Sequence, residues 1–154
     1  MAQHHFVRVL DIVRGTTVDG PGLRTSIYFA GCHHQCEGCH NPQSWDFNAG
    51  SLMSIEELIK IIKEEDFNVT LTGGDPLFHP EEVKFLVNQI RSLGYTTWIY
   101  TGFTWEEIEA DALLMEAVME AEAVVEGRYI ERLRDPDLRF RGSSNQRIVY
   151  LKDL

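Results

Sequence analysis

Cysteine is scarce in this chain of 154 residues, and the three cysteines that occur, Cys32, Cys36 and Cys39, fall within eight consecutive positions. The sequence holds no fourth cysteine that could complete a four-thiolate site. It also lacks a basic amino-terminal stretch followed by an apolar run, which argues against a secretory signal peptide. An odd number of cysteines without such a signal makes a disulfide an unfavourable interpretation.

Long hydrophobic runs are missing too, so we expect no membrane-spanning segment. Lys and Arg total 14 against 24 Asp and Glu, and this net charge of −10 argues against a general nucleic-acid binder. No repeat, low-complexity segment or linker divides the chain, so its length predicts a single domain over 1–154. Since we expect neither a membrane span nor a signal peptide, we predict a cytoplasmic protein, whose thiols stay reduced and can hold a metal.

The charges are distributed unevenly along the chain. Eight acidic residues and no basic one lie between Glu106 and Glu126, whereas six arginines lie between Arg128 and Arg147. We interpret the acidic stretch as the solvated face of a helix. The arginine-rich segment 128–147 contains the polar loop 142–146, and it is either a surface tail or a functional part of the same domain.

The cysteine spacing, C-x3-C-x2-C, allows two kinds of metal site. A 4Fe–4S cluster takes one cysteine thiolate per iron, so three cysteines would leave one iron open to a small molecule. Alternatively, three cysteines and one histidine form a common tetrahedral zinc site, which His33, His34 or His40 would complete here. The cysteines alone leave both interpretations open.

Strand and helix patterns alternate along the chain, which predicts an α/β fold with parallel strands joined by right-handed crossovers. The number of strands is too low for a closed eightfold barrel, so we expect a partial (βα) barrel or a small open sheet. The predicted strands are 23–29, 67–71, 96–100 and 123–126. The predicted helices begin at Ser54, span Pro80 to Leu93, and run from Thr104 to about Met119, with capping boxes at Ser54 and Thr104.

Each predicted strand is followed by a polar or glycine-bearing segment. These segments are the cysteine loop 31–40, then 72–76, 101–102 and 126–128. Ligand sites of α/β proteins gather at the carboxyl ends of parallel strands, so we predict one active site there. The Gly73-Gly74 pair lets the backbone approach a ligand closely, and Asp75 offers a carboxylate to an ammonium group.

The cysteine octet followed by Gly73-Gly74-Asp75-Pro76 resembles the radical S-adenosylmethionine superfamily. Segments 18–24 and 39–45 resemble the activases of glycyl radical enzymes within it. The tail, with Asp135-Pro136 and 141–146, is most similar to the branch that serves anaerobic ribonucleotide reductase. The resemblance extends from about Asp11 to Arg147.

This resemblance implies a radical SAM enzyme with a 4Fe–4S cluster whose open iron chelates S-adenosylmethionine. An electron from the cluster cleaves the sulfonium, and the resulting 5′-deoxyadenosyl radical abstracts hydrogen from a glycine of the reductase. The protein itself supplies ligation, orientation and exclusion of water. The implied partners are the reductase and, by analogy, a flavodoxin or ferredoxin-type electron donor.

The resemblance also implies roles for individual residues. Cys32, Cys36 and Cys39 are the iron ligands, and 73–75 is the segment that receives the methionine ammonium. Asp19 is interpreted as meeting the partner's glycine loop or pinning the first strand. The remaining candidates for cofactor contacts are His40, Thr101, Glu126, Arg128 and Asn145, with His40 equally interpretable as an exposed loop histidine.

Two other functions compete with this one. The chain could activate another glycyl radical enzyme such as pyruvate formate-lyase, although those activases are longer. It could also be a non-catalytic zinc or iron–sulfur binding module. Such a module has no need of the Gly-Gly-Asp-Pro loop, and a four-ligand electron carrier would use a fourth cysteine.

Overall fold

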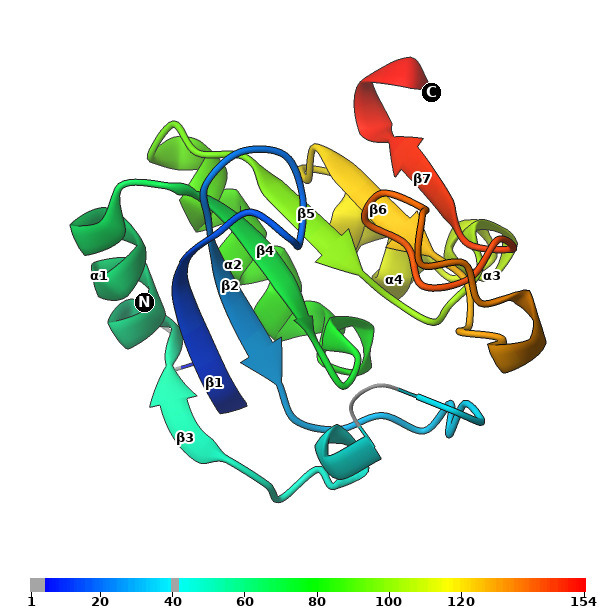
Figure 1. Cartoon of the computed structure of the whole chain (residues 1–154). Coiled ribbons are helices and arrows are strands. Elements are labelled where there is room, and N and C mark those ends of the chain that lie inside the picture. The colour runs from blue at the N-terminus through cyan, green and yellow to red at the C-terminus, as the bar shows by residue number, and fades with distance from the viewer. Residues whose placement is uncertain (1–4, 40–41) are drawn as a thin grey trace.

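The computed structural model describes residues 5–39 and 42–154, and within these ranges seven strands form one sheet (Figure 1). The order across the sheet is β3-β1-β2-β4-β5-β6-β7. The strands are β1 (Phe6–Thr16), β2 (Arg24–Phe29), β3 (Ser51–Ser54), β4 (Asn68–Gly73), β5 (Thr97–Tyr100), β6 (Ala123–Glu126) and β7 (Arg147–Tyr150). The helices are α1 (Ile55–Glu65), α2 (Pro80–Ser92), α3 (Trp105–Glu109) and α4 (Ala112–Val118), with short 3-10 helices at Pro42–Trp45, Pro76–Phe78, Glu131–Leu133 and Leu151–Asp153.

The centre of the sheet is parallel. Neighbouring strands β2, β4, β5 and β6 all run in the same direction, which confirms the predicted α/β class with parallel strands. The sheet is mixed, however, because β1 pairs antiparallel with β2 and with β3, and β7 pairs antiparallel with β6. These three antiparallel strands were not predicted, although Val7 and Val9 of β1 are buried at alternating positions as in a half-buried strand.

The helical stretch from Thr104 to Met119 is not continuous, so this part of the prediction is wrong. It is interrupted after α3, and Asp111 begins a new helix because its carboxylate accepts hydrogen bonds from the backbone N–H groups of Leu113 and Leu114. An aspartate that binds the backbone in this way favours a helix start over a helix interior. The predicted capping box at Thr104 and Glu107 is present in α3.

Helices α1 and α2 form where the sequence predicted them, for recognisable reasons. The Ser54 hydroxyl caps α1 by accepting a hydrogen bond from the backbone of Glu57, and Pro80 occupies the first turn of α2. Both helices turn one apolar face inward. The buried side chains are Ile55, Leu58 and Ile62 of α1, and Val83, Leu86, Val87 and Ile90 of α2.

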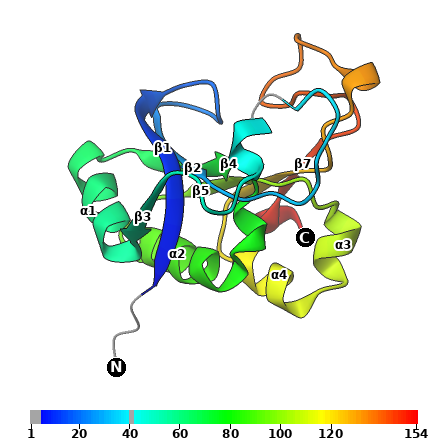
Figure 2. The same cartoon turned by 90° about the horizontal axis from the view of Figure 1, so that it is seen from below.

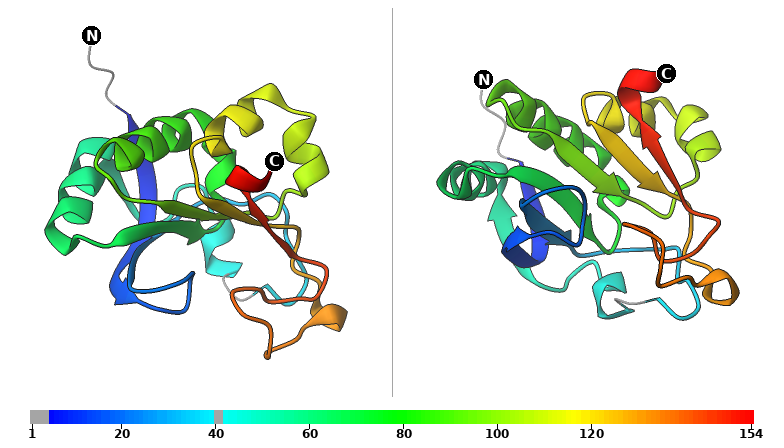
Figure 3. Two further views of the ribbon diagram at one scale, coloured as in Figure 1. Left: turned by 90° about the horizontal axis from the view of Figure 1, so that it is seen from above. Right: turned by 45° about the horizontal axis from the view of Figure 1, so that its top comes forward.

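The two faces of the sheet have different environments (Figure 2). The four helices lie on one face, where Ile27, Leu71 and Ile99 belong to the main hydrophobic core. Side chains at the alternate positions, such as Tyr28, Thr72 and Tyr100, point to the other face and line a cavity. The loop after β2 and the segment between β6 and β7 lie side by side over that face in both views of Figure 3.

A buried arginine holds the β1–β2 connection against this second face. The guanidinium of Arg24 donates to the carbonyl of Pro21, to the Thr70 hydroxyl and to the carbonyl of Val69. Burial lowers its pKa, but the guanidinium stays charged because its ordinary pKa is far above neutrality. These hydrogen bonds compensate its loss of solvation and fix the loop that carries Asp19.

None of the helices in the described ranges is long and apolar enough to cross a membrane.

Core packing predicts the effect of one substitution and its matched control. Leu71 is fully buried between the sheet and the helices, so Leu71→Ala should destabilise the protein by about 2–5 kcal/mol. Leu52→Ala, at a leucine that is 57% exposed on β3, should change stability by less than about 0.5 kcal/mol. Urea unfolding of the two apoproteins measures both values. Equal losses would contradict the assigned core.

Candidate active site

A cavity of about 590 Å³ opens at the carboxyl ends of the parallel strands, and we call it the strand-end cavity. It is lined by residues from every strand end that the sequence singled out and by the segment between β6 and β7. Its lining includes Cys32, Cys36, Cys39, Gly73, Gly74, Thr101, Gly102, Gly127 and Gln146, together with Asp19, Tyr28, His34, Tyr100, Tyr129 and residues 138–142. Segments far apart in the sequence therefore converge on one space.

The cysteine loop leaves β2 and is held by backbone hydrogen bonds to the 3-10 helix at Pro42–Trp45. The N–H of Gly31 donates to the carbonyl of Ser44 at 2.7 Å, and the N–H of Cys32 donates to the carbonyl of Trp45 at 3.3 Å. The N–H of Cys39 in turn donates to the carbonyl of Cys36 at 3.1 Å. These bonds present all three sulfurs to the strand-end cavity.

The thiol chemistry of this loop reflects its burial. Burial raises the pKa of Cys32 to about 11, and the backbone N–H groups of His34 and Gln35 partly offset this by hydrogen bonding to its sulfur. Burial also raises the pKa of Cys36, against a backbone hydrogen bond from Tyr129. Cys32 and Cys36 are not joined in a disulfide. Backbone N–H groups that point at a cysteine sulfur would stabilise the negative charge of a thiolate bound to a metal cluster.

The donor set fits a cluster whose irons are held separately. The ligands of a 4Fe–4S cluster bind different irons, so they line a wider space than the ligands of a single ion do. Three thiols on the wall of one cavity meet that requirement.

The glycine pair brings the end of β4 against the end of β2. A Cβ on Gly73 would lie 2.3 Å from the backbone nitrogen of Phe29, and one on Gly74 would lie 2.6 Å from the carbonyl oxygen of Gly31. Gly73 also has a φ of +108°, which only glycine adopts readily. Both glycines line the cavity, and they permit the backbone of β4 to touch the start of the cysteine loop.

Asp75 lies beneath the cavity wall and is fully buried. Its Oδ2 accepts hydrogen bonds from the Thr101 hydroxyl at 2.9 Å and the Gly102 N–H at 2.8 Å, and it lies 2.7 Å from His34 Nε2. Its Oδ1 accepts from the N–H of Leu77 at 2.9 Å. The carboxylate predicted to receive an ammonium group is therefore engaged by protein groups, and so is the Thr101 hydroxyl, which also accepts from the Phe103 N–H.

Gly127 lines the cavity, whereas the side chains of Glu126 and Arg128 on either side of it are bound by protein groups. Glu126 is buried and accepts hydrogen bonds from the Trp105 N–H and from Arg147. Arg128 donates to both carboxylate oxygens of Glu107, at 2.8 and 3.2 Å. These hydrogen bonds lower the pKa of Glu107 to about 2.

The polar loop near the C-terminus fastens the arginine-rich segment to the end of β6. Asn145 Nδ2 donates to the carbonyl of Arg128 at 2.8 Å, and Gln146 Nε2 donates to the carbonyl of Gly127 at 3.0 Å. The Asn145 Oδ1 atom is buried and has no hydrogen-bond partner within the described ranges. The last candidate, His40, lies outside the described residues.

The comparisons with known proteins agree with this geometry. The model of the family described as "4Fe-4S single cluster domain" matches residues 18–149. The anaerobic ribonucleoside-triphosphate reductase-activating protein of Salmonella typhi is 34% identical over 88% of this chain and 93% of that protein. The protein of the same name from Escherichia coli K12 is 32% identical over the same shares. The chain belongs to the family of anaerobic ribonucleoside-triphosphate reductase-activating proteins.

A further relative and a solved structure extend this comparison. The activating protein of the same name from Enterobacteria phage T4 is 33% identical over 85% of this chain and 86% of that protein. Among solved structures, QueE from Escherichia coli has a TM-score of 0.57 at 17% identity and covers 79% of this chain and 70% of that chain. That structural likeness shows the shared fold.

Two tyrosines of this activating-protein family member were not identified from the sequence as site residues. Tyr28 donates to the carboxylate of Asp19 at 2.9 Å, and Ser26 donates to the same oxygen at 3.0 Å. Tyr100 lines the cavity with a buried hydroxyl that has no partner among residues 5–39 and 42–154. Burial raises the pKa of Tyr100, so the phenol is neutral and offers a donor to a ligand. The signal available in the sequence was the position of Tyr100 in β5, which alternates with the positions that face the core.

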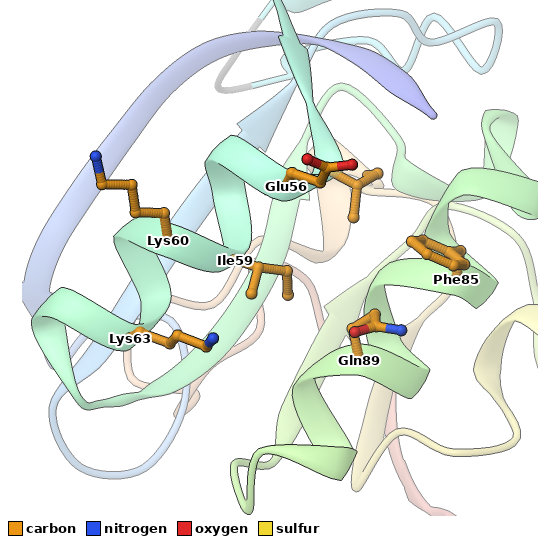
Figure 4. A pocket seen from close by; sticks show the side chains of 7 residues that line it. Glu56, Ile59, Lys60, Lys63, Phe85 and Gln89 are labelled. Atoms are coloured by element: carbon orange, nitrogen blue, oxygen red, sulfur yellow. The ribbon is translucent and has the colours of Figure 1, made fainter. Parts of the chain in front are cut away.

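A second hollow, of about 310 Å³, lies on the helical side of this family member (Figure 4). Its lining comes from α1 and α2, and the side chains of Ile59, Phe85 and Gln89 face one another across it. Lys60, Lys63 and Glu56 stand at its edge. It shares no lining residue with the strand-end cavity.

The raised thiol pKa predicts how Cys32 of the apoprotein reacts. Only the thiolate is alkylated, so the rate at Cys32 should rise about tenfold per pH unit from pH 7 to 10 without a plateau. Peptide mass spectrometry after iodoacetamide treatment measures this rate. In concentrated urea the same residue should level off above its ordinary pKa of about 8.5. A plateau near that pH in the folded apoprotein would contradict a pKa raised by the partial burial of Cys32.

Proposed function

We propose that this chain activates an anaerobic ribonucleoside-triphosphate reductase by generating a glycyl radical in it. The observation that carries the proposal is the convergence of three thiols and two glycine-bearing strand ends on one cavity, in a chain of the activating-protein family. Of the competing functions, a non-catalytic module does not use an adjoining cavity of this size. The similarity extends over 93% of the Salmonella typhi relative.

The cysteines would hold a 4Fe–4S cluster, with S-adenosylmethionine on the iron that no cysteine binds. When bound, the cluster supplies the electron that cleaves S-adenosylmethionine to methionine and a 5′-deoxyadenosyl radical. Cys32, Cys36 and Cys39 would bind the cluster as thiolates, and the backbone N–H groups at His34, Gln35 and Tyr129 would stabilise the charge of Cys32 and Cys36.

The cavity walls would orient S-adenosylmethionine. Gly73, Gly74 and Gly127 leave backbone surface open to it, and Thr101 and Gln146 complete the walls. Asp75 and Asn145 would support this surface from behind by binding Thr101 and the backbone next to Gly127, while Arg128 and Glu126 attach the end of β6 to α3, and Glu126 also to β7. The hydroxyl of Tyr100, which lines the cavity and has no partner within the described ranges, is a position where a polar ligand would replace lost hydration. We also propose that His40 contacts the cluster or the adenine, as the sequence predicted.

The side of the cavity away from the cysteines would receive the partner. Asp19, held by Ser26 and Tyr28, and the 138–142 segment line the cavity and would contact the partner. A site of this form suits a glycine-bearing loop of the reductase, from which the radical takes one hydrogen atom. A flavodoxin or ferredoxin-type protein of the cytoplasm would supply the electron.

We propose that the sheet and its helices form a partial barrel. We also propose that residues 1–154, including 128–147, form one radical SAM domain.

The function is tested with anaerobically reconstituted protein, dithionite and S-adenosylmethionine. Wild-type protein should be brown, contain iron in excess of zinc, form 5′-deoxyadenosine, and produce a glycyl-radical signal in the reductase by electron paramagnetic resonance. Cys36→Ala should lose the 5′-deoxyadenosine and the radical, because one iron ligand is missing. A colourless wild-type protein with one zinc and no cleavage would overturn the proposal.

The unpartnered hydroxyl of Tyr100 gives a finer test. Tyr100→Phe removes one oxygen, and the loss of one ligand hydrogen bond should weaken S-adenosylmethionine binding about 2- to 10-fold. Stability should not fall, because the hydroxyl has no protein partner in the described part of the chain. Equilibrium binding and urea unfolding measure the two effects, with Tyr150→Phe on the exposed face of β7 as the control. Unchanged affinity would show that the hydroxyl does not contact this ligand.

A further inference from the structure

His34 lies within the cysteine loop, between Cys32 and Cys36, yet it points into the protein. Its side chain is 5% exposed, whereas the neighbouring His33 is an exposed residue. The His34 ring packs against Phe78 at a centroid distance of 5.0 Å and edge-on against Phe103 at 4.8 Å. The ring is thus held between the 3-10 helix after β4 and the loop after β5.

The buried end of the His34 ring meets Asp75. Nε2 lies 2.7 Å from Asp75 Oδ2, and it is the donor because a carboxylate only accepts. The same oxygen accepts from the Thr101 hydroxyl and the Gly102 N–H, so one atom connects the cysteine loop with the ends of β4 and β5. Charge-assisted hydrogen bonds of this kind are the stronger ones in proteins.

Gly102 shows that the space for this ring is tightly limited. A Cβ at Gly102 would lie 2.5 Å from His34 Cδ2, and φ at this glycine is not in the left-handed region. The absence of a side chain at position 102 is therefore explained by the imidazole and not by the backbone conformation.

We infer that His34 is a positioning residue, which fixes the cysteine loop relative to the ends of β4 and β5 through the buried carboxylate of Asp75. The Asp75 N–H also donates to the carbonyl of Gly31 at 2.9 Å, so the loop is held at its first residue and at its middle. The role of this contact in S-adenosylmethionine binding rests on the proposed function, since it sets the distance between the sulfurs and Gly73-Gly74. The hydrogen bond between His34 and Asp75 itself does not depend on the cofactor.

Hydrogen exchange of the apoprotein tests, without cofactor, whether the contact between His34 and Asp75 holds the cysteine loop. His34→Ala should raise the exchange of amides in 32–39 about tenfold or more, while the urea midpoint changes little because the loop lies outside the main core. Gly102→Ala should give the same local loss by displacing the ring, although it removes no polar group. His34→Gln, which keeps an N–H donor at similar reach, should restore part of the protection. His33→Ala is the comparison: it removes ring contacts with Phe47 and Phe78 but no contact with Asp75, so it should raise exchange much less than His34→Ala does.

The reconstituted protein supplies the second readout. His34→Ala should still bind its iron through three cysteines but bind S-adenosylmethionine about tenfold or more weakly, and the spectral change of the cluster on adding S-adenosylmethionine should shrink accordingly. His34→Ala protein that matches His33→Ala in both exchange and affinity would overturn the inference. Failure of the proposed function is distinguishable, because it would appear as a wild-type protein that does not cleave S-adenosylmethionine.

Discussion

The close contact between the end of β4 and the start of the cysteine loop is the constraint on which the site depends. The N–H of Gly74 donates to the carbonyl of Phe29 at 2.8 Å, and the N–H of Asp75 donates to that of Gly31 at 2.9 Å. Only glycine at 73 and 74 allows this approach, because a Cβ at either position would overlap backbone atoms. The sulfurs consequently stand beside a stretch of backbone that carries no side chains.

The two faces of the sheet explain why a cavity lies there. One face is covered by four helices and buries aliphatic side chains, so it supplies the stability of the domain. The other carries Ser26, Tyr28, Thr70 and Tyr100, whose polar groups need hydrogen-bond partners. Asp19 and Arg24 satisfy three of them, and the hydroxyl left over on Tyr100 faces the cavity.

The sequence predicted the parallel strands and the place where their ends meet, because both follow from hydrophobic periodicity and from the position of glycine and polar residues after each strand. The antiparallel strands β1 and β7 escaped prediction. Strand β1 pairs with β2 and strand β7 pairs with β6, in each case across an intervening loop. Such pairing between separate segments is not encoded in a local sequence pattern. The break at Asp111 escaped for the opposite reason, since a local cap outweighed a periodicity that continued through it.

The directions in which side chains point were predictable only in part. A carboxylate at Asp75 and a hydroxyl at Thr101 suggested ligand contacts, but both groups bind each other and their neighbours beneath the wall. His33 and His34 are adjacent and of one type, so composition could not tell which of them is buried. That difference depends on the turn of the backbone at Gln35, which has a positive φ of 51°, and on the space above Gly102. The roles of these residues toward a cofactor stay predictions.

The charge asymmetry of the sequence acquires a structural explanation. Glu106 and Glu107 of the acidic stretch pair with Arg147 and Arg128 of the arginine-rich segment, and Arg147 also meets the buried Glu126. Exposed pairs of this kind contribute little each, but the bond to Glu126 is partly shielded from water and raises the pKa of Arg147. The pairs attach the start and the end of segment 128–147 to α3 and β6. Since the middle of that segment walls the cavity, opposite charges that look like separate surface features in the sequence together close one side of the site.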